Sequence, residues 1–199
     1  MAGPELVLAS ASPRRRELLD QLGARYLCDP ADIDESRRPG EAPATYVERM
    51  AREKARVVAA RYQHSGHSVL AADTIVLVDE DVLGKPCDHF DGLAMLAKLS
   101  GRSHSVLTAV CLNHNGVANC EVVETRVEFI SLTRELCEAY LATDEPWDKA
   151  GAYGIQGMAG AFVRSIHGSY SNVVGLPLCE TWQLLQAGGI GTGLDSRRE

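Results

Sequence analysis

Positive charge is in deficit along this chain of 199 residues, which carries 20 Lys and Arg against 27 Asp and Glu and has a formal net charge of -7 at pH 7. Proteins that bind nucleic acid generally present a basic surface to the phosphate backbone. The charge balance therefore predicts no nucleic-acid partner. Any anion that this protein binds must be met by a local cluster of cations.

Long hydrophobic runs are also missing. No window approaches the run of about 20 apolar residues that a membrane-spanning helix needs. The opening residues MAGPELVLAS have neither the basic start nor the long apolar stretch of a signal peptide. We therefore expect a cytoplasmic protein with no membrane partner.

Several patterns of reactive side chains are absent. The cysteines form no Cys-x-x-Cys pair of the kind that binds zinc or makes a redox couple, and in a reducing cytosol we expect them to be free thiols. Neither G-x-S-x-G nor H-E-x-x-H occurs, which favours activated water over a covalent intermediate if the protein is an enzyme. The six cysteines are Cys28, Cys87, Cys111, Cys120, Cys137 and Cys179.

Segments typical of strands and of helices alternate along the chain, which predicts an α/β fold. Asn115-Gly116 lies between two alternating segments and indicates a type I′ hairpin, so the sheet should be mixed. A T-x-x-E capping box at Thr45 predicts a helix that runs to about Tyr62. The other expected helices are 13–22, 91–99, 134–142 and 178–187, and strands are expected within 5–9, 68–83, 104–132 and 161–166.

The first expected helix begins with unusual charges. Ser12 is a suitable N-cap, yet the next turn contains Arg14, Arg15 and Arg16, although the N-terminus of a helix already carries about half a positive charge. The arginines could form a solvated basic face. Alternatively, Ser10, the free amides of the helix and two arginines could bind a polyanion such as a triphosphate.

Lys54 and three other charged residues stand out by their positions. Helical periodicity places Lys54 on the apolar stripe of the second helix, where its ammonium must either extend to solvent or meet a buried partner, such as a phosphate in a cleft. Asp73 follows an apolar run and should lie at the end of a strand, where carboxylates often hold Mg²⁺. Glu35 is a candidate second carboxylate, and Lys85 a further cation.

The segment from Lys149 to Gly160 contains four glycines at intervals of three residues. It lacks the lysine and hydroxyl ending of a P-loop. Tyr153 and Gln156 could offer a ring and an amide to a nucleobase, while the alternative is that the glycines only make structural turns.

Taken together, the segments LASASPRRRELL, YVERMAREKA, AADTIVL, GKP, LSGRSHSVLTAV, DKAGAYGIQG and SYSNVVGLP resemble the Maf family of nucleoside triphosphate pyrophosphatases. The resemblance runs from about residue 5 to 187, and the AGAYGIQG segment is similar to the subfamily that acts on dTTP and UTP. It implies a mixed α/β structure with a bent sheet flanked by helices and two lobes around a central cleft, like the inosine triphosphate pyrophosphatases. We expect one such domain over 1–187 and a flexible tail over 188–199.

The resemblance also implies an activity and the roles of individual residues. The expected reaction converts a nucleoside triphosphate into the monophosphate and pyrophosphate with magnesium or manganese, in a homodimer. Asp73 would be the catalytic carboxylate and, with Glu35, would hold the metal. Gln156 would read the base, and the phosphate-binding residues would be Ser10, Arg14, Arg15, Lys54 and Lys85. Two alternatives stay open: the sister subfamily that acts on 7-methyl-GTP, and a non-catalytic nucleotide-binding regulator of cell division.

Overall fold

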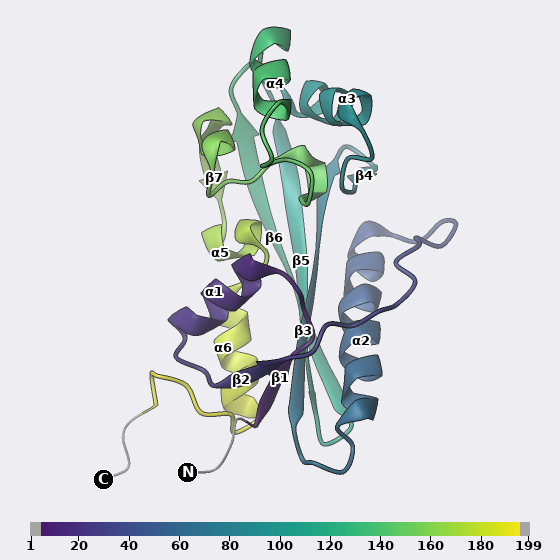
Figure 1. Cartoon of the computed structure of the whole chain (residues 1–199), viewed down its shortest axis with the longest axis vertical. Coiled ribbons are helices and arrows are strands. Elements are labelled where there is room, and N and C mark those ends of the chain that lie inside the picture. Colours follow the sequence, from purple (N-terminus) through teal and green to yellow (C-terminus); the bar gives the residue numbers. More distant parts are fainter. Residues whose placement is uncertain (1–4, 196–199) are drawn as a thin grey trace. The chain divides into compact units, whose positions relative to one another are not determined.

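The computed structural model describes residues 5–195, in two compact units. Of the described residues, unit 1 contains 5–73, 108–123 and 175–195, and unit 2 contains 74–107 and 124–174. The mixed α/β class is confirmed by the order of the elements, which Figure 1 labels. The strands are β1 (Leu6–Leu8), β2 (Tyr26–Cys28), β3 (Ser68–Val78), β4 (Asp81–Leu83), β5 (Ser103–His114), β6 (Val117–Phe129) and β7 (Val163–His167).

The α-helices follow the expected segments, with one short addition. The five-residue helix α5 and the strand β2 were not predicted, because both are too short to show a hydrophobic period. The α-helices are α1 (Pro13–Gln21), α2 (Pro43–Arg61), α3 (His89–Leu99), α4 (Arg134–Leu141), α5 (Tyr170–Val174) and α6 (Leu178–Ala187), and the 3-10 helices are η1 (Ala150–Ala152) and η2 (Met158–Phe162).

The strands pair in the order β2, β1, β3, β5, β6 and β7, with β4 also paired to β3. β1 is parallel to β2 and to β3, whereas β4 and β7 are antiparallel to their neighbours. The sheet is therefore mixed, as predicted. In unit 1, Figure 1 shows α2 on one side of the strands and α1 with α6 on the other.

The ends of the two site-bearing helices differ in how well the sequence predicted them. α1 has the predicted N-cap, since the Ser12 side chain accepts a hydrogen bond from the Arg15 amide at 3.5 Å, and Gly23 follows its end with φ of +65°. The capping box predicted for α2 is wrong. This helix begins at Pro43, whose missing amide suits a first turn, so Thr45 lies inside the helix.

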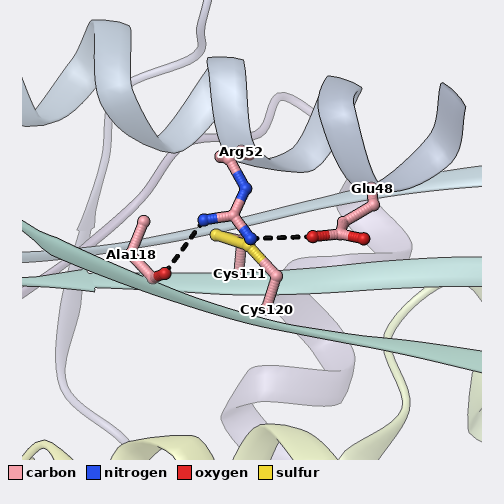
Figure 2. Close-up of a disulfide and its surroundings, with 5 residues drawn as sticks. All are labelled: Glu48, Arg52, Cys111, Ala118 and Cys120. Carbon is pink, nitrogen blue, oxygen red and sulfur yellow. Dashed lines mark hydrogen bonds and ion pairs between the residues drawn. A yellow bond between two sulfur atoms is a disulfide. The ribbon is translucent and has the colours of Figure 1, made fainter. Parts of the chain in front are cut away.

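The β5–β6 hairpin turns at Asn115-Gly116 as predicted, with positive φ at both residues. It also corrects the expectation of free thiols. Cys111 and Cys120 form a disulfide with a Cα–Cα distance of 4.0 Å, whereas Cys28, Cys87, Cys137 and Cys179 are free. Figure 2 shows the disulfide beside the Arg52 side chain of α2.

Unit 2 has an aromatic core. The Phe129 ring lies edge-on to the rings of His104 and Tyr153, with centroids 4.9 and 4.8 Å apart. His104 and Tyr153 also share a buried hydrogen bond of 2.7 Å. Helix α3 packs against α4 in the same unit. These contacts bury Tyr153, of which only 5% is exposed.

The expected tail after residue 187 is described as far as Asp195. The Gly193 amide donates to the Leu22 carbonyl at 2.7 Å, and Asp195 accepts from the Gln186 side chain and the Thr192 amide. The last four residues of the expected tail, 196–199, lie outside the described part of the chain. Within residues 5–195, no helix is both long and apolar enough to cross a membrane.

Candidate functional site

The candidate site in unit 1 is built around Lys54. The apolar stripe of α2 carries this lysine into the interior, where the residue is 8% exposed. Its ammonium Nζ lies 2.7 Å from Asp73 Oδ1 and 2.7 Å from Glu35 Oε1. A buried ammonium is costly unless it is paired and hydrogen-bonded. The structure therefore answers the question left open by the sequence: the Lys54 ammonium bonds to two carboxylates, the buried Asp73 and the more exposed Glu35.

Asp73 occupies a different place from the one predicted. Instead of ending a strand, it lies in the middle of the eleven-residue strand β3, and the residue is 9% exposed. The prediction failed because the two apolar runs around Asp73 were read as separate strands. The charge of Asp73 is tolerated inside the strand because Lys54, from the facing helix α2, donates a hydrogen bond to it.

Arg15 of α1 lies close enough to this pair of carboxylates to interact with both charges. Arg15 Nε donates to the Gly175 carbonyl at 2.8 Å, and its Nη1 lies 3.5 Å from Ser10 Oγ. Burial lowers the pKa of Arg15, the negative charges of Asp73 and Glu35 oppose this effect, and the positive charge of Arg14 adds to it. All these groups therefore share one electrostatic environment.

The three consecutive arginines differ in burial. Arg14 and Arg15 are half-buried, whereas Arg16 is exposed. Ser10 is 6% exposed, and its hydroxyl accepts a hydrogen bond from the Ser12 amide at 3.1 Å. Ser10 thus contacts Arg15, whose charge interacts with both carboxylates and with Arg14, whereas Arg16 lies on the surface of α1.

The donor set fits a hard divalent cation. Asp73 and Glu35 converge on the same ammonium, and Mg²⁺ is typically bound by one or two carboxylates together with water and phosphate oxygens. Among residues 5–195, no group of three or more His, Cys, Asp or Glu side chains could enclose a metal by itself. A metal at this pair would therefore need ligands from water or substrate.

The other two predicted site residues belong to unit 2. Lys85 follows β4, and Gln156 lies between η1 and η2; both residues are exposed. The glycine-rich segment packs closely on β3 at Gly151, which has φ of +71°. A Cβ atom added at this position would lie 3.0 Å from the Val76 side chain, so the contact requires glycine. The proposed contact of the Tyr153 ring with a base is wrong, since this ring is packed against Phe129 in the core.

Glu145 supports the segment that carries Gln156, and the sequence analysis missed it. Its carboxylate accepts hydrogen bonds from the Tyr140 hydroxyl at 2.8 Å and from the Met158 amide at 2.8 Å. The Tyr140 hydroxyl in turn accepts from the Gly154 amide at 3.3 Å. The backbone is therefore held on both sides of Gln156, by contacts between separate segments for which no periodic pattern exists.

A comparison with families of known proteins decides where the chain belongs. The model described as "Maf-like protein" matches residues 5–188. The chain belongs to the Maf family. Among curated members, a "dTTP/UTP pyrophosphatase" of Hahella chejuensis is 53% identical over 93% of this chain and 92% of its own length. A protein of the same name from Anaeromyxobacter dehalogenans is 55% identical, over 94% and 95%.

Two solved structures align with this chain at much lower sequence identity. A nucleoside-triphosphatase, dITP/XTP pyrophosphatase, of Mycobacterium abscessus aligns with a TM-score of 0.40 at 18% identity, over 62% of this chain and 73% of its own. The Ham1 protein of Staphylococcus aureus aligns with a TM-score of 0.40 at 12% identity, over 65% and 72%.

Proposed function

We propose that this member of the Maf family hydrolyses dTTP and UTP, together with modified pyrimidine triphosphates, to the monophosphate and pyrophosphate. The curated relatives named above support the substrate class. The observation that carries the proposal is the bonding of buried Lys54 to Asp73 and Glu35, close to Arg15. Such a cluster offers both a base for water and cations for phosphate oxygens.

In this proposal Asp73 acts on the attacking water. Its carboxylate orients or deprotonates a water that attacks the α-phosphorus, and the bond from that phosphorus to the bridging oxygen of pyrophosphate breaks. Asp73 and Glu35 would hold magnesium or manganese. When bound, such an ion supplies positive charge to the phosphate oxygens and lowers the pKa of a bound water.

The cations of the site have a different task. Arg14, Arg15, Lys54 and Lys85 would bind the phosphates and neutralise the charge that develops on the leaving pyrophosphate, and the Ser10 hydroxyl would donate a hydrogen bond. This role explains why α1 begins with arginines. Positive charge at a helix N-terminus is unfavourable in the free protein, but it is compensated when a highly charged anion binds.

Gln156 would select the base. Its side-chain amide can donate to O4 and accept from the N3 hydrogen of uracil or thymine. A wrong base that leaves the amide unpaired costs about 1 to 3 kcal/mol, which corresponds to roughly 5- to 150-fold discrimination. We therefore expect Gln156→Ala to reduce the preference for UTP over GTP by a factor in this range. An unchanged ranking in this variant would reject the assignment of Gln156.

The proposal extends to the assembly and location of the protein. We propose a cytoplasmic homodimer in which residues 1–187 form one family domain with two lobes, followed by a tail over 188–199. Size-exclusion chromatography with light scattering tests this proposal. The expected mass is twice the 21.5 kDa of the single chain.

A substrate panel tests the proposed activity. Pyrophosphate release is measured with magnesium from dTTP, UTP, CTP, GTP and 7-methyl-GTP. We expect turnover of dTTP and UTP. Preference for 7-methyl-GTP would instead assign the protein to the sister subfamily. Binding of nucleotide without any turnover by the folded protein would favour a non-catalytic regulator.

A further inference from the structure

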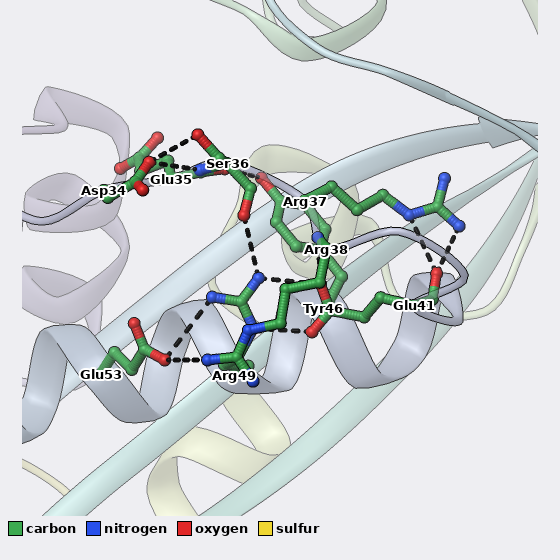
Figure 3. A network of polar contacts seen from close by, with 9 residues as sticks. All are labelled: Asp34, Glu35, Ser36, Arg37, Arg38, Glu41, Tyr46, Arg49 and Glu53. Atoms are coloured by element: carbon green, nitrogen blue, oxygen red, sulfur yellow. Dashed lines mark hydrogen bonds and ion pairs between the residues drawn. The ribbon is translucent and has the colours of Figure 1, made fainter.

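The loop that carries Glu35 is fixed to helix α2 by its backbone. This loop, residues 29–42, lies between β2 and α2. The Tyr46 hydroxyl donates to the Glu35 carbonyl at 2.8 Å, and Arg49 Nη2 donates to the Ser36 carbonyl at 3.0 Å. Figure 3 shows both side chains reaching from α2 to the loop. The backbone carbonyls of Glu35 and of the next residue, Ser36, are thus both held from one helix.

A second contact of Arg49 closes the loop near its other end. Its Nε and Nη2 donate to the two carboxylate oxygens of Glu41 at 2.6 and 2.8 Å, with side chains only 14% and 6% exposed. Glu41 also accepts from the Arg38 amide at 3.0 Å. Two parallel bonds between guanidinium and carboxylate fix direction as well as distance. Hydrogen bonding from Arg49 lowers the pKa of Glu41 to about 2, so the pair stays charged at neutral pH.

Helix α2 therefore holds Glu35 in two ways. Lys54 binds its carboxylate at 2.7 Å, while Tyr46 and Arg49 hold the backbone on which that carboxylate is mounted. The Glu35 side chain is itself 56% exposed and lies in a segment without helix or strand, so packing alone would not define its position. An ammonium can attract the carboxylate but does not fix its orientation, because it is a compact point charge.

We propose that Arg49 is a positioning residue that sets the Glu35 carboxylate beside Asp73 and thereby sets the affinity of the site for a divalent cation. Arg49 touches neither carboxylate and acts only through the loop. The inference rests on the proposed function, in which Asp73 and Glu35 hold the metal. Partners that orient metal ligands typically change metal affinity by about 10- to 100-fold when they are removed.

Arg52 provides a matched control on the same helix. It lies one turn after Arg49 and donates to the Ala118 carbonyl at 3.0 Å and to Glu48 at 2.7 Å. Figure 2 shows these contacts beside the disulfide. Loss of Arg52 removes the same charge and two hydrogen bonds from α2, but it leaves the loop of residues 29–42 untouched.

The test compares Mn²⁺ binding by the wild type and by the variants Arg49→Ala, Arg49→Lys and Arg52→Ala. Binding is measured by electron paramagnetic resonance in the presence of an α,β-imido analogue of dUTP, which the protein should not cleave. We expect the Kd for Mn²⁺ to rise at least tenfold in Arg49→Ala and to change less than twofold in Arg52→Ala. Arg49→Lys keeps the positive charge but loses the two parallel bonds of the guanidinium, so its Kd should lie between the values of the two alanine variants. Thermal unfolding followed by circular dichroism identifies any variant that does not fold.

A double-mutant cycle separates positioning from general damage. In a Glu35→Gln background, Arg49→Ala should change the Mn²⁺ affinity by less than twofold, because the carboxylate that Arg49 positions is already lost. A full tenfold loss in that background, or equal losses in Arg49→Ala and Arg52→Ala, would overturn the inference. Wild-type protein that cleaves no nucleotide in the substrate panel would instead count against the proposed function.

Discussion

The two units hold their candidate site residues by different means. In unit 1 the side chains that would act on phosphate are fixed by charge: Lys54 bonds to Asp73 and Glu35, and Arg15 lies close to both carboxylates. In unit 2 the exposed Gln156 is mounted on a segment fixed by backbone hydrogen bonds to the Glu145 carboxylate and by the buried ring of Tyr153. Charge pairs are suited to a site that must exchange partners with a charged substrate, whereas ring packing is suited to a scaffold that keeps its shape.

This difference between the two units should appear most strongly when one lysine is replaced in each of them. Lys54→Met leaves the largely buried Asp73 carboxylate without its cation, and breaking a buried pair in this way costs about 3 to 5 kcal/mol. Lys85→Met changes an exposed side chain and should cost less than about 0.5 kcal/mol. Urea unfolding measures the loss of stability in both variants. Equal stability of the two variants would contradict the assignment of Lys54 as the centre of a charge cluster.

The disulfide of unit 1 should have the next largest effect. It closes a loop between Cys111 and Cys120, which are nine residues apart, and a loop of this size contributes about 2.5 kcal/mol to stability. Dithiothreitol should therefore lower the free energy of unfolding of the wild type by about this amount. The double variant Cys111→Ala and Cys120→Ala should show no response to the reductant. An equal response of both proteins would argue against the disulfide.

Acid should act on unit 2 through His104. Burial lowers the pKa of His104 to about 4 in the folded protein, against 6.5 for the ordinary side chain. Between these values the unfolded chain binds the proton and the folded chain does not. The stabilisation is therefore complete above pH 6.5 and is lost as the pH falls toward 4.

The contribution of His104 to the free energy of unfolding should be about 2 kcal/mol smaller at pH 5 than at pH 7.5. It is measured as the pH dependence of the free energy of unfolding of the wild type minus that of His104→Gln. The variant His64→Gln, which changes an exposed histidine, is the control for the loss of one histidine. A His104→Gln variant that loses stability with acid as steeply as the wild type would show that His104 is not the group responsible.

Local and periodic features of the fold could be predicted from the sequence. The N-cap at Ser12, the turn at Asn115-Gly116 and the bounds of α6 depend on residues close together in the chain, and all three are confirmed. Helical periodicity also predicted correctly that Lys54 faces inward. Asp73 was placed at the end of a strand because a lone charge in an apolar run resembles a boundary until its partner on another element is known.

The features that were missed depend on contacts between separate elements of the fold. The salt bridge of Arg49 with Glu41 joins a helix face to a loop of irregular backbone, and no period in the sequence indicates it.

The disulfide, in contrast, could have been predicted. With Asn115 and Gly116 as the two turn residues, Cys111 and Cys120 are directly opposite each other on the hairpin, in the closer, non-hydrogen-bonded class of pairs. The expectation of free thiols was based on the compartment and not on the geometry of the hairpin.

The most direct test of the central claim is the identity of the products formed from dTTP by the wild type and by Asp73→Asn. The proposal predicts dTMP and pyrophosphate from the wild type and a rate about 10² to 10⁴ times lower in Asp73→Asn, which keeps an oxygen to accept from Lys54 but loses the base. Asp20→Asn, at an exposed carboxylate bonded to Tyr26, should keep the wild-type rate. Release of dTDP and phosphate, or an unchanged rate in Asp73→Asn, would contradict the proposed reaction.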